Sequence, residues 1–228
     1  MRTTNRLAKL SLIAAAAVCI ASPGRADEAV DAKGKVLFTE DFESGLDRWE
    51  LLDPKTWKLT SDAGNTALEI TARESEYAPP HRSPLHVALV KDLTPKDFEI
   101  TFRVRSTRDT GNHRDCCVFF GYQDPKHFYY VHLGALPDPH SGQIMIVDDA
   151  PRLAMTENKT PVRWDDAWHN VRIVRRASDG SIEVFFDDME KPIMTAKNDK
   201  FAAGRVGIGS FDDMDAFDDI VIRELPAK

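Results

Sequence analysis

Three observations predict that this chain is all-β, with two stacked antiparallel sheets. Apolar and polar residues alternate in short segments, as they do in strands with one buried face. Turn-forming pairs such as Asp124-Pro125 and Asp179-Gly180 separate these segments. No segment keeps an apolar period of 3.6 residues for more than about two helical turns. The pattern therefore favours antiparallel hairpins over helices.

The strand expected at Phe98–Arg105 shows the alternation most clearly. Its four apolar residues point to one side, while Arg103 and Arg105 point to the other. One face of this strand is therefore expected in the core and the other is expected to be exposed to solvent. The same pattern predicts further strands at Val36–Phe42, Ala67–Thr71, Val87–Val90, Cys116–Tyr122, Phe128–Leu133, Gln143–Val147, His169–Val174, Ile182–Phe186, Ile193–Ala196, Arg205–Ser210 and Phe217–Ile222. This many short strands exceeds what one open sheet usually holds, so two sheets are expected.

The first 26 residues have the pattern of a cleaved export signal. Three positive residues precede an apolar run over 10–21, and small residues lead to a cleavage site after Ala26. The run is shorter than the roughly 20 residues that a membrane-spanning helix needs, so no membrane span is expected. We therefore expect a periplasmic or secreted protein.

Removing this signal peptide leaves a short tail at 27–34, expected to be flexible, and one domain over 35–225. A single all-β domain of this size is common. Removal also takes away four positive charges and no negative one, which shifts the formal net charge from −7 to −11. Such a surface repels phosphate backbones, so nucleic acid is not an expected partner.

Acidic residues lie beside the first and the last expected strands. Asp41 and Glu43 flank Phe42, and Asp218 lies in the last strand. If these strands meet, the three carboxylates can share a divalent cation, since Ca²⁺ takes several oxygen ligands at about 2.3–2.6 Å. We expect a structural calcium ion there, with a solvated acidic strand end as the alternative. The denser acidic cluster over 212–215 is expected to be a solvated loop.

Five segments carry a resemblance to a known superfamily. They are DFEITFRVRS, CCVFFGYQDPKHFYYVHLG, WHNVRIVR, GRVGIGS and FDDIVI, and with their surroundings they cover nearly the whole domain in order. The chain resembles the concanavalin A-like lectin/glucanase superfamily, and within it the 3-keto-disaccharide hydrolase-like and laminin G-like domains. The resemblance implies a jelly-roll sandwich with one concave sheet, often with calcium where the first and last strands pair.

The resemblance also implies a carbohydrate partner, bound on the concave face. Members include lectins, carbohydrate-binding modules, glycoside hydrolases and polysaccharide lyases, so the fold alone selects no activity. Two alternatives stay open: a glycan-cleaving enzyme, either 3-keto-glycoside hydrolase-like or a lyase, and a laminin G-like protein-interaction module. Family 16 glucanases carry Glu-x-Asp-x-x-Glu on one strand, whereas the strand Ile182–Phe186 offers only Glu183. An ordinary retaining glucanase is therefore not favoured.

A tyrosine, a histidine and an arginine are the candidate catalytic residues. On the strand Phe128–Leu133 the alternation places Tyr130 and His132 together on the face away from the core. With Arg105 they could abstract a proton beside a carboxylate and balance its charge, as a uronate lyase requires. They could equally hold a sugar without reaction, because a tyrosine ring packs on a pyranose and arginine supplies directional donors. Packed or solvent-facing side chains without a function are the third alternative.

Three more residues are candidate substrate ligands. Arg103 shares the wet face of its strand with Arg105, and Arg82 and His86 adjoin a proline-rich loop that could fold over the groove. We therefore expect all six side chains to face one glycan site.

Cys116 and Cys117 are adjacent on an expected strand. Neighbouring side chains on a strand point to opposite faces, which disfavours a disulfide between them. We expect one thiol in the core and the other partly exposed. An oxidising compartment leaves a vicinal disulfide as the alternative.

Overall fold

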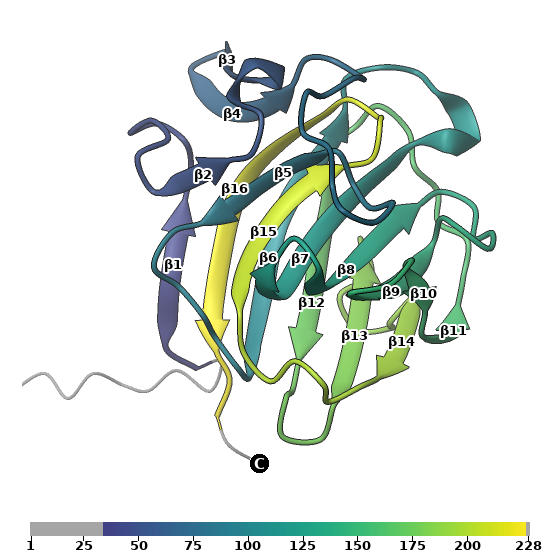
Figure 1. Ribbon diagram of the computed structural model, residues 1–228. Coiled ribbons are helices and arrows are strands. Elements are labelled where there is room, and N and C mark those ends of the chain that lie inside the picture. Colours follow the sequence, from purple (N-terminus) through teal and green to yellow (C-terminus); the bar gives the residue numbers. More distant parts are fainter. Residues whose placement is uncertain (1–33, 227–228) are drawn as a thin grey trace, which may run out of the picture.

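Two antiparallel sheets packed face to face make up residues 34–226, the part of the chain that the computed structural model describes (Figure 1). The predicted signal peptide and, except for Gly34, the predicted tail over 27–34 lie outside the described residues. The strands are β1 (Val36–Glu40), β2 (Trp49–Leu51), β3 (Trp57–Asp62), β4 (Asn65–Ile70), β5 (His86–Val90), β6 (Phe98–Ser106), β7 (Asp115–Asp124), β8 (His127–Gly134), β9 (Gln143–Asp148), β10 (Leu153–Ala154), β11 (Thr156–Lys159), β12 (His169–Arg175), β13 (Ser181–Phe186), β14 (Met194–Lys197), β15 (Arg205–Ser210) and β16 (Asp215–Glu224). The predicted all-β sandwich of two antiparallel sheets is confirmed.

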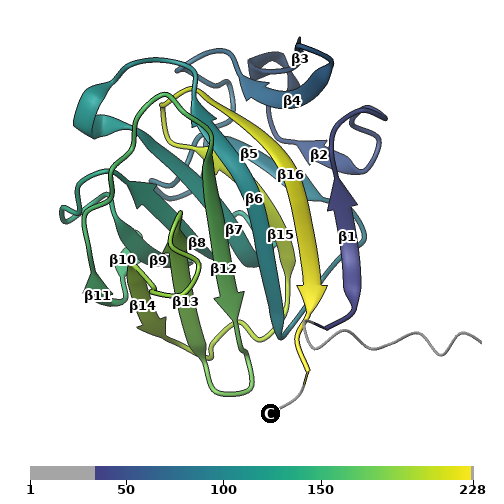
Figure 2. The ribbon, with the colours of Figure 1, turned by 180° about the vertical axis from the view of Figure 1, so that it is seen from behind.

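The nine-stranded sheet has the order β11-β14-β13-β12-β6-β16-β4-β3, and β1 also pairs with β16. Figure 2 shows this sheet nearer the viewer. The seven-stranded sheet has the order β10-β9-β8-β7-β15-β5-β2. The predicted meeting of the first and last strands is correct, because Phe38 of β1 pairs with Ile222 of β16. The strands β2, β3, β10 and β11 were not among those the sequence predicts.

The main core lies between the two sheets. The burial of β6 alternates strictly along its length, and its inward residues, from Phe98 to Val104, belong to this core. On β16 the inward register changes from Phe217 to Ile220 through a bulge in which Asp219 takes a positive φ of 51°. The bulge lets one long strand keep its apolar residues inside on both sides of an acidic pair.

The outer faces of the two sheets differ in polarity. The nine-stranded sheet carries ion pairs on its outer face, such as Arg172–Glu99 at 2.6 Å. The seven-stranded sheet carries a second apolar cluster outside, which includes Phe119 and Tyr130. The loop between β4 and β5 runs over this face, and its Tyr77 packs on the cluster (Figure 1). Only the first outer face is therefore open and polar.

Candidate functional site

Two connections between the sheets run side by side at one end of the sandwich. The segment 107–114 leads from β6 to β7, and the segment 211–214 leads back from β15 to β16. The Thr107 amide donates to the Met214 carbonyl at 2.9 Å. The Thr110 hydroxyl donates to Asp213 Oδ2 at 3.0 Å. These contacts define the end site, the region between the two connections and the strand ends they join.

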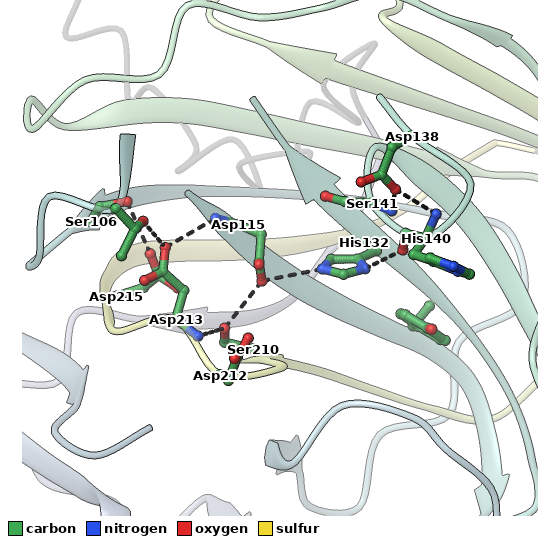
Figure 3. Close-up of polar contacts among 12 residues, drawn as sticks. Ser106, Asp115, His132, Asp138, His140, Ser141, Ser210, Asp212, Asp213 and Asp215 are labelled. Atoms are coloured by element: carbon green, nitrogen blue, oxygen red, sulfur yellow. Dashed lines mark hydrogen bonds and ion pairs between the residues drawn. The ribbon is translucent and has the colours of Figure 1, made fainter. Parts of the chain in front are cut away.

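Three aspartates are buried in the end site (Figure 3). The backbone N–H of Asp115 donates to Asp213 Oδ2 at 3.2 Å, and the Ser210 hydroxyl donates to Asp115 Oδ1 at 3.3 Å. Asp215 is fully buried, and its Oδ1 accepts the Ser106 hydroxyl at 3.3 Å while its Oδ2 has no partner. Each of the three carboxyl groups therefore accepts at least one hydrogen bond from a hydroxyl or a backbone amide of the end site.

Burial changes the protonation of two of these groups. It raises the pKa of Asp213, and the nearby charge of Asp115 adds to the rise. Burial raises the pKa of Asp215 well above its ordinary value, with Asp213 and Asp115 as further causes. The environment thus favours the neutral acid at both positions.

A pocket of about 450 Å³ opens beside the buried aspartates. Its walls come from the two connections, from the start of β7, from Arg73 and from the loop after β8. The charged and amide side chains that line it are Arg73, Asn112, His113, Asp115, Asp138, Asp212 and Asp213. Arg73 donates to Asp212 Oδ2 at 2.8 Å on the rim. The pocket therefore offers many carboxylate acceptors and a few donors to one ligand.

Asp138 lines the same pocket as Asp213 but has a different environment. Its Oδ1 accepts the backbone N–H groups of His140 and Ser141 (Figure 3). Partial desolvation opposes ionisation, but these two donors lower the pKa of Asp138. One pocket thus holds a carboxyl group with a raised pKa and one with a lowered pKa.

His132 lies beside the end site in a fixed orientation. Its Nδ1 is 2.7 Å from the His140 carbonyl oxygen, so Nδ1 carries the hydrogen. Its Nε2 lies 3.2 Å from Asp115 Oδ1 (Figure 3). The ring stacks on Phe211 at 5.1 Å between centroids. His132 is therefore positioned by contacts on both of its nitrogens and on one ring face.

The structure confirms that Tyr130 and His132 share the outward face of β8, but it buries both. Tyr130 is 0 % exposed, and its hydroxyl accepts Arg152 Nη1 at 3.0 Å. Burial raises the pKa of Tyr130, so its phenol stays protonated. A substrate cannot reach this hydroxyl as the side chains lie.

The structure does not bring Arg105 or Arg103 to Tyr130 and His132. Both arginines lie on the outer face of the nine-stranded sheet, each about 5.0 Å from the centre of the Trp168 ring. They line a separate pocket of about 260 Å³. The prediction of one shared site was wrong, because the outward faces of β6 and β8 belong to different sheets and point in opposite directions.

The predicted pair Arg82 and His86 is also separated. Arg82 is exposed and lines a small pocket with Phe211. His86 is fully buried on the core side of β5, where its ring meets the edge of Trp57. Burial lowers the pKa of His86, which favours the neutral form of this core side chain.

Asp41, Glu43 and Asp218 do not converge on one point. Asp218 Oδ2 accepts Arg103 Nη2 at 2.6 Å and Asn65 Nδ2 at 2.9 Å, and the side chain is buried. Glu43 binds the amide and the hydroxyl of Thr66. As they lie, these carboxylates are satisfied by protein donors and do not fit a calcium ion. Calcium binding by this protein stays a prediction.

Cys116 and Cys117 are free thiols. Cys116 is in the core between the sheets, and Cys117 is in the outer apolar cluster of the seven-stranded sheet. The expectation of opposite faces is confirmed. The expected partial exposure of one thiol was wrong, since both are 0 % exposed. Loops cover the face on which Cys117 lies.

The prediction missed the aspartates of the end site. The cluster over 212–215 was expected to be solvated, but Asp213 and Asp215 are 4 % and 0 % exposed. No sequence pattern around Asp115 indicated a site, because its partner Asp213 is nearly a hundred residues away in the sequence. The one usable clue was the position of the cluster, which directly follows the glycine-rich strand GRVGIGS and so lies at a strand end.

The structure defines a β-sandwich of two antiparallel sheets with a polar pocket at one end. Neither the protein-family models nor the curated proteins give a match to the sequence. Several solved structures match the fold, among them the carbohydrate-binding module CBM66 of Bacillus subtilis, with a TM-score of 0.54, 14 % identity and coverage of 78 % of this chain and 97 % of that one.

Two other solved structures match the same fold. A Bacillus subtilis protein of unknown function with a galectin-like fold has a TM-score of 0.59 and 12 % identity, over 84 % of this chain and 97 % of its own. Domain 4 of AbnA, an extracellular arabinanase of Geobacillus stearothermophilus, in complex with arabinotriose, has a TM-score of 0.52 and 11 % identity, over 86 % and 95 %. At these identities the likeness establishes the fold. Among residues 34–226 no helix is long and apolar enough to cross a membrane.

Proposed function

We propose that this chain is an exported carbohydrate-binding protein whose glycan site is the pocket of the end site. The observation that carries the proposal is that four aspartates, an asparagine and an arginine line one pocket of about 450 Å³. This volume lies within the range of about 300–1,000 Å³ typical of small-molecule sites. The export signal expected over 1–26 accords with a glycan encountered outside the cytoplasm.

The chemistry of the pocket suits a polyol. Sugar hydroxyl groups both donate and accept, and carboxylates such as Asp138 and Asp212 accept without donating. Arg73 and Asn112 supply the complementary donors. A negatively charged lining disfavours anionic glycans, so a neutral oligosaccharide is the favoured ligand class.

The proposal places the glycan away from the outer face of the seven-stranded sheet. That face holds Tyr130 and His132, but the loop bearing Tyr77 and the side chain of Phe211 cover it. The neighbouring solved structures support a carbohydrate role because their names include a carbohydrate-binding module and an arabinanase domain in complex with arabinotriose. These names do not indicate which face of the sandwich binds carbohydrate.

Glycan hydrolysis is the second candidate, favoured by the contrast between Asp213 and Asp138. Glycosidases need one carboxyl group that keeps its proton and one that is ionised. Burial raises the pKa of Asp213, whereas the amides of His140 and Ser141 lower that of Asp138. Asp213 would be the proton donor to the leaving oxygen, and Asp138 the base or nucleophile.

The test is a binding and turnover panel with matched variants. Purified protein is incubated with neutral and acidic oligosaccharides, including 3-keto-glycosides, and is assayed by calorimetry for binding and by mass spectrometry for products. Arg73→Ala and Asn112→Ala change the pocket, and Arg105→Ala is the control because it lines the separate pocket on the other sheet. We expect neutral glycan binding that weakens about tenfold or more in the pocket variants and is unchanged in the control.

Three results would decide against parts of this account. Loss of binding in Arg105→Ala alone would move the glycan to the outer face of the nine-stranded sheet. Absence of binding across the whole panel would refute the glycan proposal and favour the protein-interaction alternative. Products that survive in Asp213→Asn would exclude Asp213 as the proton donor, since an amide cannot replace its acid function.

A further inference from the structure

We propose that Asp115, Cys117 and His132 bind a zinc ion. One ligand atom from each, a carboxylate oxygen, a thiol sulfur and an imidazole nitrogen, lie within 4.8 Å of one another. Within residues 34–226 this is the one set of three such donors that meets that limit. All three residues are buried. The proposal does not depend on glycan binding.

The strand register sets the three donors together. Cys117 of β7 pairs directly with His132 of β8, so their side chains are neighbours on one face. Asp115 precedes Cys117 by two residues and therefore points to the same face. Donors on paired strands are held more rigidly than donors on loops, which suits a metal site.

His132 is oriented as a metal ligand. Its Nδ1–H donates to the His140 carbonyl at 2.7 Å, so in the neutral imidazole the lone pair is on Nε2. Metal-binding histidines commonly donate their second nitrogen to a carbonyl or carboxylate in this way. His132 Nε2 is buried without a hydrogen-bond partner, in a side chain 5 % exposed. A buried imidazole nitrogen without a hydrogen-bond partner is a candidate metal ligand.

The neighbours of Nε2 strengthen this argument. Asp115 Oδ1 lies 3.2 Å from it, so with a neutral imidazole two electron-rich atoms face each other in a region of low dielectric constant. A cation between them turns this repulsion into attraction. Zinc bonds of about 2.0–2.3 Å in tetrahedral geometry imply donor separations of roughly 3.3–3.8 Å. The 3.2 Å between His132 Nε2 and Asp115 Oδ1 is close to this range, and the sulfur lies within 4.8 Å of both atoms.

The donor set selects the metal class. Thiolate and imidazole ligands favour zinc over magnesium or calcium, which prefer oxygen. A thiolate and a carboxylate together balance the two charges of Zn²⁺. Asp115 also lines the pocket of the end site, which gives an ion a route from solvent and leaves a fourth position for water.

The test uses the full chain, kept reduced, stripped with chelator and titrated with Zn²⁺ or Co²⁺. Cobalt bound to a thiolate gives a charge-transfer absorption in the near ultraviolet, which reports sulfur ligation directly. Cys117→Ser should lose this band and bind zinc at least a hundredfold more weakly. Cys116→Ser is the matched control, because Cys116 is adjacent and equally buried but points into the core.

Further variants keep the proposal falsifiable if Cys117→Ser does not fold. Asp115→Asn and His132→Gln should each reduce zinc affinity tenfold or more while circular dichroism shows a native β spectrum. One equivalent of metal per chain, with the band lost in Cys117→Ser and kept in Cys116→Ser, would support the site. Failure of the wild-type protein to retain zinc, or cobalt binding without a thiolate band, would overturn it.

Discussion

Replacing Asp215 by asparagine should stabilise the protein by an amount that grows with pH. The carboxyl group is fully buried, and its Oδ2 has no partner. Burial, with the charges of Asp213 and Asp115, raises its pKa well above the ordinary value. The unfolded chain loses this proton near pH 4 while the folded chain keeps it, so wild-type stability falls as pH rises towards the folded pKa. Each pH unit in this window costs about 1.4 kcal/mol.

Asparagine at position 215 has the shape of the neutral acid and does not titrate. The free energies of unfolding should therefore differ by a small constant near pH 4 and diverge above it, by about 1.4 kcal/mol for each pH unit until the folded pKa is reached. For a domain of this size each such step corresponds to roughly 3–6 °C in melting temperature. Urea unfolding at several pH values, with chelator present, measures the difference. A gap that stays constant with pH would refute the argument that Asp215 is held neutral.

Two further substitutions test the buried contacts of Asp218 and the close packing of β15 on β5. Asp218→Ala removes the acceptor of Arg103 Nη2 and Asn65 Nδ2, and we expect a loss of about 2–4 kcal/mol in urea unfolding, with or without calcium. A loss seen only with calcium would instead support the calcium site predicted from the sequence. Asp41→Ala, which removes another predicted ligand of that site, should then show the same calcium-dependent loss. Gly209→Ala places a Cβ at 1.8 Å from the His86 carbonyl oxygen on the neighbouring strand. We expect a loss of about 3 kcal/mol or more, and a melting temperature unchanged within 2 °C would contradict the close packing of β15 on β5.

Alternation along single strands was enough to predict most of the fold. The β6 segment buries every second residue as predicted, and β8 places Val131 inside and Tyr130 outside. The strands that the sequence did not predict are short or exposed at sheet edges. β10 has two residues, both exposed, and β11 is polar over Thr156–Lys159. Such strands form because a neighbour offers backbone groups, and their own side chains carry little signal.

The site was harder to predict because alternation separates core from outer face without saying which sheet a strand joins. Arg105 and His132 both point away from the core, as predicted. β6 and β8 belong to different sheets, so these side chains are on opposite outer faces. The two outer faces also differ in cover, since a loop and Phe211 bury Tyr130 and His132, while Arg105 stays half-buried.

The end site follows from topology. The connections after β6 and after β15 both change sheets at the same end, and this brings Asp115 within hydrogen-bond distance of Asp213. A buried carboxylate is costly unless donors, a proton or a cation offset its charge. Burial favours the protonated form of Asp215 and Asp213, and Asp213 also accepts from the Thr110 hydroxyl and a backbone amide. Asp115 accepts from the Ser210 hydroxyl alone among neutral donors. Asp115 is therefore the carboxylate with the greatest need of a cation, and it is the one placed beside Cys117 and His132.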